Sequence, residues 1–284
     1  MAWIVDHGAV VQGSDVRRLI INGDDYGFTE GVVRAILDAH RVGVVTSTTA
    51  LVNMPAWDAG AALLRETPSL RAGVHLVFND GAPVLPPERV PTLVHSSGRF
   101  MKDVELRQRA DTLNTAELKA EFRAQIERFR SAGLQPTHLD NHCSISYENP
   151  EWFRVTVELA AEYDLPMRLP FGDDLPQLVA GLVGQTGLPA ERVLAQGLSF
   201  QRLLQELGVR RPDRFVMTFS RDGGRTVDNL LAILERLPEG TSELLTHPGY
   251  GIPWRQAEIE VLLDPRVRQY LRRSDLELVS FAAL

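Results

Sequence analysis

The sequence predicts an α/β protein with a (β/α)-barrel-like parallel sheet and helices packed outside it. Short runs rich in β-branched residues alternate with segments of helical spacing along the chain, an alternation typical of parallel sheets. The expected strands number about eight, which favours a closed or nearly closed barrel. The same alternation permits an open doubly wound sheet, which remains the alternative fold.

In the first half of the chain, a strand at residues 18–22 is followed by a helix at 29–41, with Thr29 as N-cap and Gly43 beyond its end. Residues 79–111 contain four prolines and predict a long loop or small subdomain, a kind of segment that is often functional. The other expected elements are strands at 44–52, 72–78 and 136–143, and helices at 55–65 with Pro55 in its first turn, 115–131 capped by Thr115, and 150–163.

The second half continues the alternation. Residues 172–189 are expected to form a connection rich in Gly and Pro, and the Gly pair at 222–225 indicates a turn rather than a phosphate-binding loop. Residues 1–17 are interpreted as an N-terminal arm and residues 18–284 as a single domain. The expected elements are strands at 167–171, 215–220, 243–247 and 276–281, and helices near 191–207, 227–237 and 256–270.

Composition narrows the classes of protein. The net charge of −7 gives no electrostatic footprint for nucleic acid. No apolar run reaches the roughly 18 residues of a membrane span. The first 18 residues do not have the pattern of a signal peptide. The lone Cys143 cannot form an intrachain disulfide. A cytoplasmic protein without a membrane span is therefore expected.

Side chains of the metal-binding type fall at the ends of the predicted strands. Because parallel strands share one rim at their carboxyl ends, residues far apart in sequence can converge there. Several of these residues also have a purely structural explanation: a turn for Asp24 and Asp25, a core position for His75, and a tight turn for His247. Three others alternate along one strand and would share a face. The residues are Asp24, Asp25, His75, His138, Asp140, His142 and His247.

One aspartate and two histidines would leave positions open for water and substrate around a divalent ion. Such a site activates water and polarises a carbonyl, and acid–base groups beside it add about 10²–10⁴-fold each. There is no G-x-S-x-G motif to indicate a serine nucleophile. The same set of ligands would also suit a metal-dependent barrel enzyme that acts on a sugar or an amide, such as an isomerase or phosphodiesterase. It would also suit a sugar-binding protein that has lost catalysis.

Five stretches of the sequence, which contain the candidate residues above, resemble the YdjC-like carbohydrate deacetylases. The resemblance covers nearly the whole chain from Arg18, and the segment 43–53 is its most specific part because no generic metal site requires it. Residues 143–147 depart from it, because many relatives have further histidines there and this chain has Cys-Ser-Ile-Ser-Tyr. The similar stretches are residues 19–27, 43–53, 73–76, 136–142 and 246–249.

The resemblance implies a distorted barrel and the removal of an N-acetyl group from an acetylated sugar. It implies one divalent metal ion, with zinc favoured and magnesium allowed, and a homodimer only by analogy. The implied roles are metal ligands for Asp25, His75 and His142, a general base for Asp24, a general acid for His247, a substrate contact for Arg168, and positions behind the ligands for His138 and Asp140.

Overall fold

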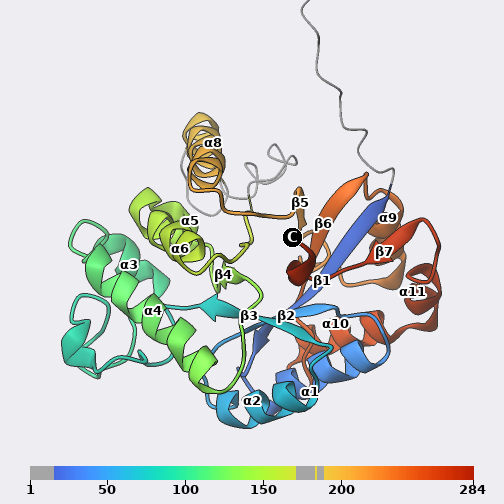
Figure 1. The fold of residues 1–284 in the computed structure, drawn as a ribbon, viewed down its shortest axis with the longest axis horizontal. Helices are drawn as coiled ribbons and strands as arrows, with labels where there is room; N and C mark the ends of the chain where they lie inside the picture. Colours follow the sequence, from blue (N-terminus) through green and yellow to red (C-terminus); the bar gives the residue numbers. More distant parts are fainter. Residues whose placement is uncertain (1–15, 171–182, 184–188) are drawn as a thin grey trace, which may run out of the picture.

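The computed structural model describes residues 16–170, 183 and 189–284. A parallel sheet of seven strands lies at its centre, with helices around the outside (Figure 1). This confirms the predicted α/β, barrel-like fold. The strands are β1 (Arg17–Tyr26), β2 (Ser47–Ala50), β3 (Arg71–Leu76), β4 (Leu139–Asn141), β5 (Arg214–Val216), β6 (Gly240–Thr246) and β7 (Leu276–Leu278).

The strand order is β4-β3-β2-β1-β6-β5, and β7 pairs with the first residues of β1. The edge strands β4 and β5 do not pair with each other within the described ranges, so this sheet is a half-barrel. The strand expected at 167–171 is reduced to a single bridge between Met167 and Leu139, and Phe171 lies outside the described residues. Most other strands are shorter than predicted, because residues at their ends leave the sheet to form its rims.

The helices follow the predicted spacing. The described α-helices are α1 (Glu30–Arg41), α2 (Trp57–Glu66), α3 (Asp103–Gln108), α4 (Thr115–Ser131), α5 (Ile145–Glu148), α6 (Pro150–Glu162), α8 (Ala190–Glu206), α9 (Val227–Glu235), α10 (Pro253–Leu263) and α11 (Pro265–Tyr270), with 3₁₀ turns η1 (Pro87–Arg89) and η2 (Phe281–Ala283).

Three helix starts test the capping predictions. Thr29 caps α1 as predicted, because its side chain accepts a backbone N–H of the first turn. The cap predicted at Thr115 is wrong: Asn114, one residue earlier, accepts the N–H and caps α4. Pro55 lies outside the first turn of α2, whose N-cap is Ala56. A capping side chain must precede the first helical residue, and sequence alone left that boundary uncertain by one residue.

The single helix predicted at 256–270 is two helices, α10 and α11. Pro265 disfavours helical backbone at the residue before it, and Asp264 adopts an extended conformation with ψ of 133°. The Asp264 side chain then caps α11 by accepting the N–H of Arg266. The helix therefore breaks where the proline dictates.

Buried polar side chains of α4 form hydrogen bonds to the backbone of the connection between β3 and α4. Glu121 accepts the N–H groups of Val84 and Leu85, and Gln125 both accepts from and donates to the backbone of Val77. Burial raises the pKa of Glu121, and these N–H groups oppose the shift. As predicted, the segment is a long connection, with η1 and α3 as its regular parts. It is thereby fixed beside the carboxyl end of β3.

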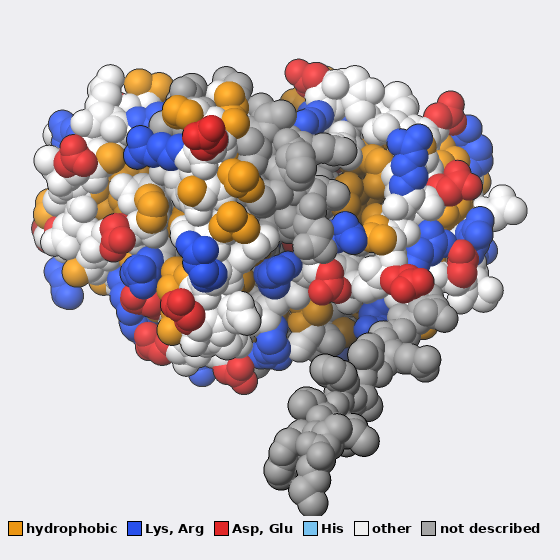
Figure 2. All heavy atoms as spheres, turned by 90° about the horizontal axis from the view of Figure 1, so that it is seen from above, with side chains coloured by type: hydrophobic (Ala, Val, Ile, Leu, Met, Phe, Trp, Pro, Cys, Tyr) orange, Lys and Arg blue, Asp and Glu red, His pale blue; other side chains and the backbone are white. Residues whose placement is uncertain are grey.

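The surface agrees with the charge balance of the sequence. Figure 2 shows Lys and Arg side chains interspersed with Asp and Glu, and no broad basic area lies among the described residues on this face. None of the described helices has the length and apolar composition to cross a membrane. The predicted arm falls almost wholly within residues 1–15, outside the described ranges, and the single-domain boundary at residue 18 stays a prediction.

Candidate active site

The carboxyl end of β1 carries the two consecutive aspartates. β1 does not stop before them. A register shift between Gly23 and Tyr26 marks a β-bulge, and Asp25 has a φ of 68°. Consecutive residues of a regular strand point to opposite faces, but a bulge re-aims side chains. Both carboxylates therefore approach Nε2 of His75, Asp24 at 3.7 Å and Asp25 at 3.3 Å.

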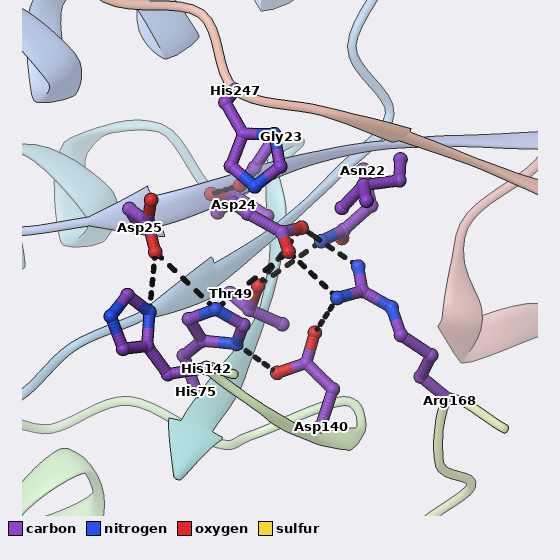
Figure 3. A network of polar contacts seen from close by, with 12 residues as sticks. Asn22, Gly23, Asp24, Asp25, Thr49, His75, Asp140, His142, Arg168 and His247 are labelled. Carbon is purple, nitrogen blue, oxygen red and sulfur yellow. Dashed lines mark hydrogen bonds and ion pairs between the residues drawn. The ribbon is translucent and has the colours of Figure 1, made fainter. Parts of the chain in front are cut away.

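Asp25, His75 and His142 form a group able to hold a metal ion (Figure 3). Oδ1 of Asp25 lies 2.9 Å from Nδ1 of His142, and the three donor atoms are within 4.8 Å of one another. Asp24, His75 and Asp140 form a second, overlapping group. Both groups lie around His75, and only His142 is partly exposed, so access to the first group is from the His142 side.

Asp140 orients His75 from behind. Its Oδ1 lies 2.5 Å from Nδ1 of His75, which turns Nε2 toward the two β1 carboxylates. Burial lowers the pKa of His75, but the charge and hydrogen bond of Asp140, together with Asp25 and Asp24, outweigh burial and raise the pKa to about 9. Burial also opposes a charge on His142, and Asp25 nevertheless holds its pKa well above the usual range. The carboxylates Asp140 and Asp25 thus favour the positively charged form of the two imidazoles.

Arg168 lies within a buried network of three carboxyl groups. Nη1 and Nη2 donate to both oxygens of Asp24 at 2.7 Å, while Asp140 and Glu243 lie 2.9 and 2.6 Å from the guanidinium. Burial raises the pKa of Asp24, but Arg168, with smaller contributions from His75 and His247, outweighs burial and lowers the pKa to about 2. Burial prevails at Glu243 and raises its pKa to about 7. Arg168 is 3% exposed, so this geometry assigns its donors to carboxyls rather than to an open pocket.

His247 follows β6 and lies above Asp24 (Figure 3). Its backbone N–H donates to Glu258 at 2.5 Å, and its ring packs edge-on against Trp254 with centroids 5.6 Å apart. Nδ1 lies 3.4 Å from the hydroxyl of Ser220. The imidazole is therefore fixed on the side of the site opposite His142, and its charge lowers the pKa of Asp24 further.

The prediction that His138, Asp140 and His142 share one face of a strand is wrong, because β4 spans Leu139–Asn141 alone. Asp140 and His142 nevertheless belong to the possible metal-binding groups, whereas His138 belongs to neither of them. Its ring stacks on Phe281 at a centroid distance of 3.7 Å, and burial lowers its pKa to about 3. Its hydrogen-bond contact within the described chain is Thr137, not a member of the site.

Three buried charged residues of the site escaped prediction from the sequence: Glu243, Arg255 and Glu258. Glu243 directly precedes the apolar pair Leu244-Leu245 in β6, a strand that is almost wholly buried. A carboxyl beside that pair was a signal, because a buried charge needs a partner. Arg255 and Glu258 lie on α10 and match an ordinary i,i+3 surface pair. The sequence held no comparable signal for them.

A family model described as YdjC-like protein matches residues 18–273. The chain belongs to the YdjC-like family. A carbohydrate deacetylase of Brevibacillus brevis is 32% identical over 281 residues, covering 94% of this chain and 99% of that protein. A carbohydrate deacetylase of Geobacillus stearothermophilus is 31% identical over 276 residues, covering 93% and 97%. The resemblance identified from the sequence motifs is thus confirmed.

Solved structures agree with this membership. The crystal structure of an Enterococcus faecalis protein, described as a cellobiose-phosphate cleavage protein, has a TM-score of 0.78 at 29% identity and covers 94% of this chain and 98% of that one. An uncharacterised Agrobacterium tumefaciens protein shares the fold alone, with a TM-score of 0.54 at 12% identity, covering 95% of this chain and 90% of that one.

Residues 143–147, which were expected to depart from the family pattern, follow His142 directly. Cys143 and Ser144 are partly exposed, and the short helix α5 then begins at Ile145. Ser146 is 1% exposed, so its hydroxyl does not line an open surface.

Proposed function

We propose that this YdjC-like protein is a metal-dependent hydrolase that removes the N-acetyl group from an acetylated amino sugar or oligosaccharide. The observation that carries the proposal is the convergence of Asp25, His75 and His142 beside a second carboxylate, Asp24, whose oxygen faces the same donor atoms. The naming of full-length relatives as carbohydrate deacetylases supports the substrate class. A cytoplasmic location and a homodimer stay predictions.

The donor set fits a divalent cation. Four carboxyl groups and two guanidiniums meet here, so two negative charges remain unbalanced when the carboxyls are ionised and the imidazoles neutral. A divalent ion held by Asp25, His75 and His142 balances them. Imidazole with a single carboxylate favours zinc over magnesium, which prefers oxygen ligands. Such an ion supplies Lewis-acid chemistry, which lowers the pKa of a water molecule and polarises the acetyl carbonyl.

Asp24 is the proposed general base. Arg168 keeps its carboxylate ionised at neutral pH, and a hydrogen bond of 2.7 Å from Asn22 helps to fix Oδ1. Oδ2 lies on the side of Nε2 of His75, and we assign it the proton of the attacking water. Arg168 is proposed to position this base, a role that replaces the substrate contact expected from the sequence.

His247 is the proposed general acid. It lies across Asp24 from the ligand group, so the acetyl carbon would be attacked on one side while the sugar nitrogen leaves toward the imidazole. Protonation of that nitrogen by His247 turns a poor amide anion into a neutral amine. Glu258 fixes the backbone of His247, and Trp254 fixes the orientation of its ring.

The test is acetate release from a panel of N-acetylated sugars. Metal-stripped protein is compared with protein reloaded with zinc, magnesium, manganese or cobalt, and Asp24→Asn serves as the matched control because it keeps the shape of the side chain. We expect release that requires metal and falls about 10²–10⁴-fold in the variant. Intact sugars in every reaction, with metal still bound, would favour another amide substrate or a sugar-binding role instead.

A further inference from the structure

Helix α10 directs two buried charged side chains toward the rim from positions one turn apart. Arg255 is 5% exposed and Glu258 is fully buried. Glu258 accepts the N–H of His247, and Arg255 donates through Nη2 to Oδ2 of Asp25 in a short ion pair. One turn of a single helix thus contacts both sides of the site.

The two oxygens of Asp25 are divided between different partners. Oδ1 faces the imidazoles of His75 and His142 at 3.3 and 2.9 Å, and Oδ2 faces Arg255. Because Asp25 lies at a bulge with positive φ, its backbone adopts a conformation that non-glycine residues seldom occupy. A partner for Oδ2 fixes the rotation of the carboxylate in this setting.

Arg255 is itself held by aromatic rings. Its guanidinium carbon lies 4.4 Å from the ring centroid of Trp254 and 5.5 Å from that of Phe28. Asp25 is the carboxylate paired with it in the described chain. A planar guanidinium suits a position between rings, whereas the ammonium of lysine does not stack. The contact with Asp25 therefore depends both on the planar shape of the guanidinium, which fits between the rings, and on its charge, which pairs with the carboxylate.

We infer that Arg255 is a positioning residue for the metal ligand Asp25. It neutralises Oδ2, presents Oδ1 alone to the two imidazoles, and opposes two-oxygen coordination of the ion. The inference rests on the proposed metal site and extends it, since the proposed function uses Arg255 only as one of the two cations in the charge balance. Partners of this kind behind metal ligands usually change metal affinity or activity by about 10–100-fold when removed.

The experiment measures binding of zinc alone, by titration calorimetry, to metal-stripped wild type, Arg255→Met, Arg255→Lys and Arg225→Met. Arg225 is the matched control: its guanidinium lies 5.2 Å from the same Trp254 ring, but it pairs with Glu258 and not with Asp25. We expect zinc affinity to fall about 10–100-fold in Arg255→Met, to fall less in Arg255→Lys, and to stay within about twofold in Arg225→Met, taking the usual small effect of changes away from the ligands.

The visible absorption of the cobalt-loaded proteins gives a second readout, because a carboxylate that changes its coordination alters the spectrum whereas loss of packing does not. Wild-type zinc affinity and an unchanged cobalt spectrum in Arg255→Met would overturn the inference, as would an equal loss in the Arg225 control. If Arg255→Met does not fold, wild-type binding and spectrum in Arg255→Lys would overturn it in the same way.

The proposed function can fail separately. A wild type that binds zinc but releases no acetate contradicts the deacetylase and leaves the role of Arg255 to the binding data. A wild type that binds no divalent ion contradicts both. A loss confined to the Arg255 variants supports the inference whatever the substrate proves to be.

Discussion

The charge on His75 makes the stability of the metal-free protein depend on pH in an unusual direction. Burial lowers the pKa of this imidazole and Asp140 raises it, with a net rise from 6.5 to about 9. A pKa that is higher in the folded than in the unfolded state gives stability that is complete below pH 6.5 and lost as pH rises through 9. His142 shifts in the same direction.

The size of the effect follows from the shift. At about 1.4 kcal/mol per pKa unit, the rise at His75 corresponds to on the order of 3 kcal/mol of unfolding free energy. Between pH 7 and 9.5, His138 and Asp24 do not titrate, because their pKa values are about 3 and about 2. His142 titrates in the same direction as His75, and Glu243, with a pKa of about 7, completes its ionisation at the lower end of this window. Raising the pH across this window should therefore destabilise the metal-free protein by about that amount.

Urea unfolding followed by circular dichroism, at pH 7 and 9.5, measures this directly. His75→Gln should show a clearly smaller loss, since only the contribution of His142 remains. Zinc-loaded wild type should show the opposite trend, because proton release from both imidazoles favours metal binding at higher pH. Metal-free wild type that keeps or gains stability up to pH 9.5 would refute the assignment of charged imidazoles at the site.

Three further predictions concern separate parts of the fold. Arg168→Met should destabilise the protein by about 3–5 kcal/mol in urea unfolding, because it leaves three buried carboxyls without their cation; a change below about 1 kcal/mol would contradict the network. Gly73→Ala should cost about 1–3 kcal/mol, because the new Cβ would lie 2.5 Å from both Nδ1 and the backbone oxygen of His138, and thermal melting at the wild-type value would contradict this close packing. His247→Gln should lower turnover about 10²–10⁴-fold with zinc affinity unchanged in calorimetry, and a parallel loss of zinc would assign His247 to metal binding instead.

Sequence periodicity was enough to predict the order of the elements, since helical spacing and β-branched runs are local. It could not predict the lengths of strands such as β4, because a strand ends where its neighbours stop pairing. The strand expected at 167–171 shows this most clearly: Met167 pairs once with Leu139 and Arg168 then turns its side chain into the network. The break at Asp264 was available in principle, because the rule for residues before proline is local.

The candidate site was predictable where chemistry stands out from its surroundings. No single structural role explains histidines and paired aspartates at the ends of several strands. Their positions therefore indicated that the site lies at the rim of the sheet. The direction of each side chain could not, because alternation along β4 suggested that His138 faced the site and β1 gave no sign of its bulge. Arg255 was out of reach for another reason: its burial comes from Trp254 and Phe28 together, and Phe28 is distant in sequence.

The bulge in β1 also explains how two adjacent carboxylates can have different tasks. Both face His75, and without further partners each would be an equivalent ligand. Arg168 donates to both oxygens of Asp24, so that Asp24 would bind a cation less strongly. Arg255 donates to a single oxygen of Asp25 and leaves the other oxygen for coordination. In the proposed mechanism, the carboxylate with two arginine contacts acts as the base, and the carboxylate with one arginine contact acts as the metal ligand. We therefore propose that the arginine partners, Arg168 after β4 and Arg255 on α10, distinguish the two adjacent aspartates.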